Sequence, residues 1–202
     1  LRLAGFAAGT VPALKLDGLR VQGSRQIARA LQARRPEPSL FDEDPAARAR
    51  ADEAERWGDE ELQEVPRTLM RWGLLGHMRL RVWLAEVSRL PAPALTARAS
   101  GPAARYYARV IGADERAARE TVEHLPETLA RVDALLGDGV LRVESPNAAT
   151  LQVLSSVRAL DGFADLHEHV AVHPSAAAAR ALFPDFPGPV PEFLPPAWLA
   201  AL

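Results

Sequence analysis

The sequence contains no cysteine, which excludes disulfide bonds, thiolate metal sites and a cysteine nucleophile within its 202 residues. Lysine is nearly absent as well, because Lys15 is the only one and every other basic side chain except histidine is an arginine. Together with the abundant alanine, this usage is typical of a GC-rich bacterial genome. It carries no information about activity.

The chain also lacks any apolar run near the length that crosses a bilayer, and its start shows no signal-peptide pattern. A formal net charge of -2 gives no electrostatic reason to expect a nucleic acid or an anionic membrane as partner. With 48% hydrophobic and 25% charged residues, the composition is that of an ordinary soluble globular protein, which we expect in the cytoplasm. Because residue 1 is Leu1 and not methionine, further residues are expected to precede it.

The most informative segment is residues 10–31, which reads TVPALKLDGLRVQGSRQIARAL. Its two short apolar runs flank an Asp-Gly pair, which favours a tight turn between antiparallel strands. Ser24 then stands at the position of a helix N-cap, and Ile27 and Leu31 lie four residues apart on one face. The pattern predicts strand, turn, strand and helix. Ser24 either only caps this helix or also helps to bind an anion, since a helix start offers unpaired N–H groups.

A proline-rich stretch over residues 32–45 reads as a linker between two units. Pro36 and Pro38 end the predicted helix. Leu40 and Phe41, in the middle of the linker, are expected to pack between the two units rather than lie free in solvent. An Asp-Pro pair closes the linker and supplies an N-cap and a first-turn proline for the next helix.

Helical periodicity dominates the rest of the chain, so we expect an all-helical domain over residues 45–202 after a first domain over residues 1–38. Apolar residues recur at gaps of three and four over residues 69–87, which predicts one helix. Gly73 and Gly76 inside it can permit close approach of another helix or a ligand.

Three further expectations concern the helical domain. Asn147 is expected to cap a helix with apolar side chains around most of its circumference, which is therefore buried. The charged run over residues 48–61 is expected to be a solvated helix face with intrahelical ion pairs. The Pro-rich residues 183–202 are expected to be an irregular tail whose aromatic side chains pack back on the bundle.

At the start of the chain, residues 1–9 are expected to be a loop or a helix remnant that leads into the hairpin segment.

The segment around Val11-Pro12 and residues 24–31 resembles the second half of the thioredoxin-like domain of the glutathione S-transferase superfamily. In that family a Val-Pro with a cis-proline precedes a hairpin, and a Ser opens a helix that reads approximately S-R-x-I-A-x-x-L. The resemblance implies a mostly α fold: a partial thioredoxin-like α/β domain (hairpin plus helix) followed by an all-α glutathione S-transferase C-terminal-like bundle of about five helices. It further implies a homodimer, and a first strand, helix and second strand before Leu1.

The resemblance implies glutathione as co-substrate and no metal. The backbone of Val11, before cis-Pro12, would pair with the cysteinyl part, and Ser24 would bind the γ-glutamyl carboxylate together with N–H groups of the helix. Gly23 occupies the position at which the family usually has Glu or Gln. The Tyr, Ser or Cys that activates the glutathione thiol lies near the first helix of the family, so this catalytic residue is expected upstream of Leu1.

The family places an electrophile pocket between its two domains, and Arg56, Trp57 and Trp72 are the candidates by position. The alternative is that they pack in the core or an interface, as aromatic residues at helical spacing usually do. The implied function is conjugation or reduction of a small hydrophobic electrophile. A non-catalytic member that binds a ligand or protein through the same cleft is the alternative, favoured by Gly23 and by Thr150, which replaces an acidic capping residue of the family.

Three histidines, His167, His169 and His173, lie close together in the sequence with Glu168. A His-x-His pair on a helix directs its two rings about 200° apart, so the two cannot share one ion there. With no thiolate and no matched spacing, no metal site is expected.

Overall fold

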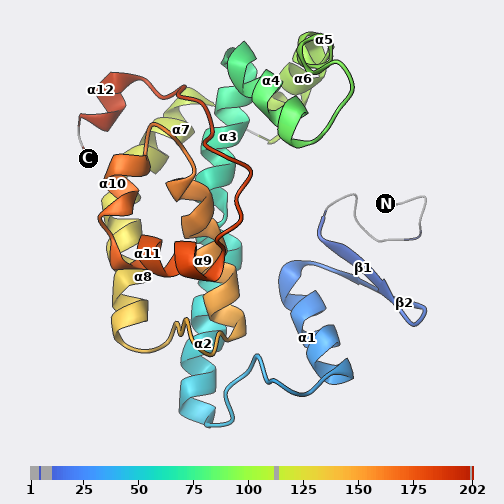
Figure 1. The fold of residues 1–202 in the computed structure, drawn as a ribbon, viewed down its shortest axis with the longest axis vertical. Helices are drawn as coiled ribbons and strands as arrows, with labels where there is room; N and C mark the ends of the chain where they lie inside the picture. Colours follow the sequence, from blue (N-terminus) through green and yellow to red (C-terminus); the bar gives the residue numbers. More distant parts are fainter. Residues whose placement is uncertain (1–4, 6–10, 112–113, 201) are drawn as a thin grey trace.

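The protein is mostly helical, and a two-stranded antiparallel sheet stands beside the helices in the part of the chain that the structure describes (Figure 1). The computed structural model describes residues 5, 11–111, 114–200 and 202, and for residues 107–111 it describes the backbone only. Apart from Gly5, the expectation for residues 1–9 lies outside these residues. No helix among the described residues has both the length and the apolar character needed to cross a membrane.

The hairpin consists of β1 (Ala13–Leu16) and β2 (Leu19–Gln22), and α1 (Ser24–Arg34) follows it, so the predicted order of strand, turn, strand and helix is confirmed. The remaining elements are α2 (Pro45–Trp57), the π-helix η2 (Gly58–Leu62), α3 (Glu64–Gly76), α4 (Met78–Val87), α5 (Pro93–Ala99), α6 (Gly101–Ile111), α7 (Glu115–Glu123), α8 (Leu125–Gly137), α9 (Ala148–Asp161), α10 (His167–Ala171), α11 (Pro174–Leu182) and α12 (Pro196–Leu199). The bundle of about five helices implied by the resemblance is therefore wrong in number, because the helical part is divided into more and shorter helices.

The hairpin turn follows from its Asp-Gly pair. Asp17 has φ 48° and Gly18 has φ 85°, and a two-residue turn with positive φ at both positions matches the twist of the strands on either side. The strands pair antiparallel with Leu14 opposite Val21. The hairpin therefore leads directly into α1 at a defined register.

The single helix expected over residues 69–87 is wrong, because the chain breaks between α3 and α4. His77 has an extended backbone, with φ −110° and ψ 106°. The break is stabilised by Arg81, whose Nη1 donates hydrogen bonds to the carbonyl oxygens of Leu74 at 2.7 Å and Leu75 at 3.1 Å. A cation at the end of α3 thus satisfies carbonyl groups that the helix itself leaves unpaired.

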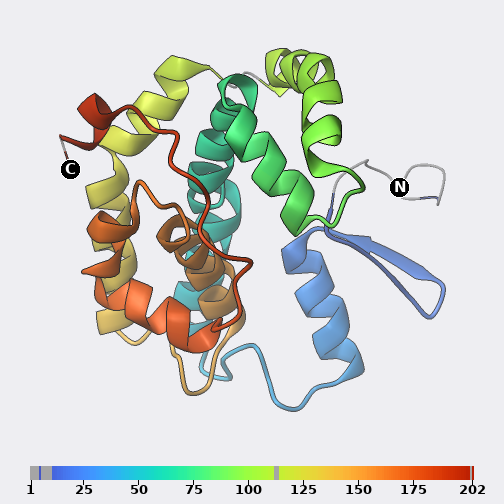
Figure 2. The same cartoon turned by 45° about the horizontal axis from the view of Figure 1, so that its top comes forward.

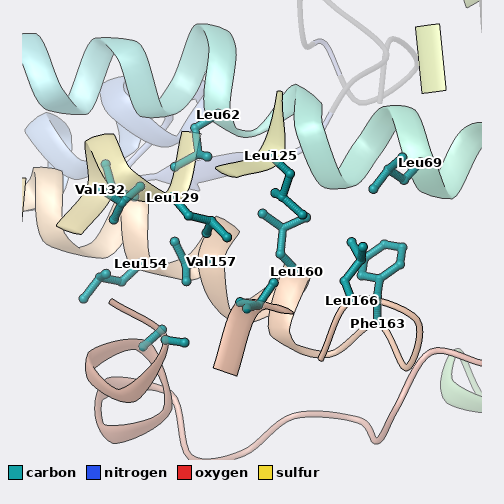
Figure 3. Close-up of a cluster of buried hydrophobic side chains, with 14 of the residues drawn as sticks. Leu62, Leu69, Leu125, Leu129, Val132, Leu154, Val157, Leu160, Phe163 and Leu166 are labelled. Carbon is teal, nitrogen blue, oxygen red and sulfur yellow. The ribbon is translucent and has the colours of Figure 1, made fainter. Parts of the chain in front are cut away.

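The centre of the bundle is α9, as its all-round apolar pattern predicts. The side chain of Asn147 accepts a hydrogen bond from the Thr150 N–H at 2.8 Å, which confirms the predicted cap. Apolar side chains of α9 meet those of η2, α3 and α8 in one cluster, of which Figure 3 labels Leu62, Leu69, Leu125, Leu129, Val132, Leu154, Val157, Leu160, Phe163 and Leu166. The described cluster contains no residue before Ala51.

The linker packs between α1 and the bundle, as expected for its two apolar residues. The Leu40 carbonyl accepts a hydrogen bond from the Ala148 N–H at 2.9 Å, which ties the linker to the start of α9. The Phe41 ring lies against two guanidinium groups, 5.1 Å from that of Arg29 on α1 and 4.4 Å from that of Arg48 on α2.

The C-terminal tail crosses the bundle from α11 to α12 (Figure 2). Phe193, Leu194 and Trp198 are buried, which confirms that the tail packs back. The Trp198 ring centroid lies 4.8 Å from that of Trp72 on α3. The backbone N–H groups of Phe193 and Leu194 both donate to Asp165, at 2.7 and 3.0 Å, so the tail is held by polar as well as apolar contacts.

Candidate functional site

The candidate site lies where the N-terminus of α1 meets the helical bundle. Gly23, with φ 89° and ψ 140°, is the N-cap of α1, and Ser24 is its first helical residue. The prediction that Ser24 caps the helix is therefore wrong, because the glycine one residue earlier already turns the chain into the helix. The Ser24 hydroxyl instead donates a hydrogen bond to Asp59 Oδ1 at 2.9 Å. This bond joins the first unit of the chain to the second.

Asp59 lies in η2, where the helical hydrogen bonding widens by one residue. The Gln63 N–H donates to the Gly58 carbonyl at 3.0 Å, a bond that spans five residues. Single π-turns inserted between α-helices occur frequently at functional sites. A Cβ on Gly58 would lie 3.0 Å from Val153 Cγ2, so the glycine lets α9 approach η2 closely beside the site.

Four residues named from the sequence meet at this end of the hairpin. The peptide bond between Val11 and Pro12 is cis, and the Pro12 carbonyl accepts a hydrogen bond from the Gly23 N–H at 3.1 Å. This bond brings the cis-proline next to the start of α1 and therefore to Ser24. Val11, which precedes the cis-proline, is 75% exposed.

Gln26 is a candidate that sequence reasoning missed. A Cβ built on Gly23 would lie 2.5 Å from Gln26 Oε1, which means that the Gln26 amide reaches back over the glycine. A polar group thus occupies the space that the side chain of residue 23 would otherwise take. The spacing of three residues along α1 was the available signal, because such residues are neighbours on a helix surface.

Ion pairs to one buried carboxylate, that of Glu55, link α1 to the bundle. Glu55 of α2 is 2% exposed and accepts hydrogen bonds from Arg29 Nη1 at 3.0 Å and Arg29 Nη2 at 2.8 Å. These bonds raise the pKa of Arg29 above its ordinary value, against the lowering effect of burial. Arg25 Nε lies 3.5 Å from the same carboxylate. Both arginines come from α1, so one carboxylate of the bundle holds two turns of the helix.

The expectation of a fully solvated charged face over residues 48–61 is therefore wrong in part. Arg48 pairs with Asp52, at 3.2 Å, and Arg56 with Glu53 along the same helix, as expected. Glu55 points instead toward α1. The tertiary contact could not be read from the sequence, because both arginine partners lie in a separate unit.

An apolar groove begins about one helical turn beyond Asp59, at Gln63. It has a volume of about 370 Å³. Its walls come from α3, α4, α9 and the C-terminal tail, and include Pro66, Met70, Trp83, Ala159, Phe163, Phe186 and Val190. Arg67 and Arg71 line it as well. Gln63, four residues after Asp59, is the lining residue that follows the Ser24–Asp59 bond most closely in the sequence.

The three residues named from the sequence for the electrophile pocket do not come together. Trp57 is buried in the core, 6% exposed, with the Arg131 guanidinium 4.1 Å from its ring centre. Arg56 pairs with Glu53 on the surface. Trp72 lines a second cavity, which shares no lining residue with the groove just described. Trp57 therefore packs in the core, which is the alternative that its helical spacing favoured.

The second cavity has a volume of about 980 Å³ and an acidic lining that contains Glu115, Asp165, Glu168 and Glu192. His167 and His169 also line it, whereas the Nδ1 atom of His173 lies 2.6 Å from Asp133 Oδ2. Within the described residues, no three His, Cys, Asp or Glu side chains are grouped so that they could hold a metal ion.

Comparison with known proteins adds no assignment to this geometry. No protein-family model, no curated protein and no solved structure matches the chain. The resemblance to glutathione S-transferases therefore stays a prediction from the residues of the chain.

Proposed function

We propose that the protein is a glutathione S-transferase-like enzyme of the cytoplasm, which uses glutathione to conjugate or reduce a small hydrophobic electrophile. One observation carries the proposal: Ser24, at the N-terminus of α1, is bound to Asp59 about one helical turn from an apolar groove. A polar tripeptide and an apolar co-substrate need adjoining subsites of these two kinds.

The γ-glutamyl end of glutathione carries an α-carboxylate and an α-ammonium group. In the proposed complex, the carboxylate binds at the N-terminus of α1, where free N–H groups and the helix dipole favour an anion. Asp59 accepts a hydrogen bond from the ammonium group, and the Ser24 hydroxyl turns from Asp59 to the carboxylate. Gln26 supplies the amide that Gly23 lacks.

The cysteinyl part of glutathione lies along the backbone at Val11, in the manner of an added strand. Because the chain has no cysteine, glutathione supplies the thiol. In conjugation, the thiolate sulfur forms a bond to an electrophilic carbon in the groove, and the leaving group departs with its electron pair. The resemblance assigns thiol activation to a residue before Leu1, and it also implies a homodimer, which sedimentation velocity tests.

Titration with glutathione tests the proposal. Glutathione should raise the midpoint of thermal unfolding as its concentration rises, because a ligand that binds only the native state stabilises it by mass action. Ser24→Ala and Asp59→Asn should each weaken binding about fivefold to tenfold, the effect of one lost hydrogen bond or charge contact. Ser145→Ala, in an exposed loop, is the matched control and should change nothing. No shift at millimolar glutathione would contradict the proposal.

The second candidate function is a non-catalytic protein that binds a ligand or a protein through the same cleft. Gly23 favours it, since the position offers no side chain of its own to glutathione. Conjugation of glutathione to chlorodinitrobenzene separates the two candidates. Glutathione binding without turnover supports the second candidate, and turnover supports the enzyme.

A further inference from the structure

We infer that the apolar groove binds a small apolar molecule that carries an anionic group, such as a carboxylate or sulfonate, and that Arg71 and Arg67 recognise that group. Within the proposed function, this names the class of the second substrate. The inference deepens that proposal, although the binding itself does not require glutathione.

The charge balance of the groove is the first observation. Arg67 Nη1 donates to Glu64 Oε1 at 3.0 Å, and Arg71 Nη1 donates to Glu64 Oε2 at 2.6 Å. Two guanidinium groups thus share one carboxylate, which leaves one positive charge in excess. Burial raises the pKa of Glu64, but the hydrogen bonds from Arg67 and Arg71 outweigh burial and hold the pKa below its ordinary value. Glu64 therefore stays ionised at neutral pH.

The two arginines retain donors for a second anion. A guanidinium has five N–H donors, and the bond to Glu64 uses one from each. The side chains of Arg67 and Arg71 are 40% and 31% exposed, so a bound molecule can reach them. No acidic side chain is among the described residues that line the groove. A ligand anion therefore meets an excess positive charge and no opposing carboxylate in the lining.

The remaining walls favour an apolar body. Trp83, Phe163 and Phe186 contribute aromatic rings, and Met70 adds a flexible thioether side chain that adapts to varied shapes. The volume of about 370 Å³ lies in the range of about 300–1,000 Å³ that small-ligand pockets occupy. An aromatic molecule of one or two rings with an acid group matches both parts of the groove.

The second cavity, which is the larger of the two, differs from the groove in the charge of its lining. Its lining contains the acidic residues Glu115, Asp165, Glu168 and Glu192, which repel an anion. The two cavities therefore differ in the charge of their linings, and an apolar anion is expected to bind the groove in preference to the second cavity. This difference favours the groove over the second cavity for such a ligand.

Two fluorescent probes with the same ring system test the inference: anilinonaphthalene sulfonate, which is anionic, and phenylnaphthylamine, which is neutral. The anionic probe should bind the wild-type protein about tenfold more tightly, as expected for a charge-assisted hydrogen bond. Arg71→Gln should weaken the anionic probe about fivefold to tenfold and change the neutral probe less than about twofold.

A paired substitution separates charge recognition from structural damage. Glu64→Gln removes the carboxylate that competes for the arginines, so it should tighten the anionic probe about threefold while Arg71→Gln weakens it. Ala159→Phe fills the groove and should weaken both probes. Arg116→Gln, which removes an exposed arginine on α7, is the matched control and should leave both affinities unchanged. Circular dichroism and thermal unfolding verify the fold of each variant.

The inference is overturned if Arg71→Gln and Glu64→Gln shift the affinity for the sulfonate in the same direction. It is also overturned if both probes lose affinity equally in Arg71→Gln, or if neither responds to Ala159→Phe. A parallel glutathione titration keeps the two proposals apart. Expected probe behaviour without glutathione binding supports anion recognition in the groove and contradicts the proposed function, and glutathione binding without probe discrimination does the reverse.

Discussion

Two glycines within one turn of α3 have different surroundings, which shows how much single side chains matter in this fold. A Cβ on Gly73 would lie 2.6 Å from both Leu80 Cδ2 and Phe193 Cε2, whereas nothing lies within 4 Å of a Cβ on Gly76. Gly73 therefore lets α4 and the tail pack against α3, as the sequence suggested for both positions. Only the structure separates the residue that is needed from its neighbour.

Gly73→Ala should lower the free energy of unfolding by about 1 to 3 kcal/mol, because Leu80 and Phe193 must move to admit one methyl group. Gly76→Ala is the matched control. It should be neutral or slightly stabilising, since alanine has the higher helix propensity and meets open space. Urea denaturation measures both variants. Equal losses would contradict the packing role assigned to Gly73.

At the scale of elements, Asp133 joins α8 to the start of α11. Its carboxylate accepts a hydrogen bond from the Ser175 N–H at 3.0 Å, and the other oxygen lies 2.6 Å from His173 Nδ1. Burial raises the pKa of Asp133, but the hydrogen bonds from Ser175 and His173 outweigh burial and set the pKa below its ordinary value. The charged form of Asp133 is therefore part of the connection between the two helices.

This shift has a definite consequence for stability against pH. Since the pKa is lower in the folded state, the stabilisation is complete above the unfolded pKa of about 4 and is lost as the pH falls through the folded pKa. Asp133→Asn should lower the free energy of unfolding at pH ~7 by about 1 to 2 kcal/mol. The difference from wild type should shrink below pH ~4. Urea titrations at several pH values measure it, and a difference that stays constant down to pH ~2 would contradict the assignment.

At the scale of the whole molecule, several hydrogen bonds and ion pairs attach α1 to the bundle. No residue of β1, β2 or α1 is buried, whereas ten residues of α9 are. These contacts include the Ser24–Asp59 bond, the Glu55 ion pairs with Arg29 and Arg25, and the Arg29–Asp52 ion pair at 3.3 Å. The geometry of the proposed glutathione site therefore depends on a few charged groups.

Glu55→Gln should loosen this attachment, because it removes the charged partner of Arg25 and leaves Arg29 with Asp52 alone, at 3.3 Å. We expect amide hydrogen exchange in α1 to become at least about tenfold faster, while exchange in α9 stays unchanged. Glu53→Gln, on the exposed face of the same helix, is the control and should leave both helices as in the wild type. Acceleration in α9 equal to that in α1 would instead indicate global destabilisation.

Local sequence was sufficient for the elements whose physics is local. The Asp-Gly turn, the Asn147 cap and the buried character of α9 depend on backbone conformation and periodicity within a few residues, and all three were predicted. The N-cap of α1 was predicted at Ser24 but lies one residue earlier, at Gly23. The conformation of Gly23 depends on its hydrogen bond to Pro12 across the hairpin, which no local pattern contains.

Only the tertiary structure decided which charged residues carry the candidate site. From the sequence, Glu55 and Asp59 belong to a solvated run, and Trp57 and Arg56 are pocket candidates of equal standing. Folding brings α1 against that run, buries Trp57 and joins α3, α4, α9 and the tail into a groove. These contacts join residues far apart in the chain, so their free energies depend on packing geometry that no local pattern contains.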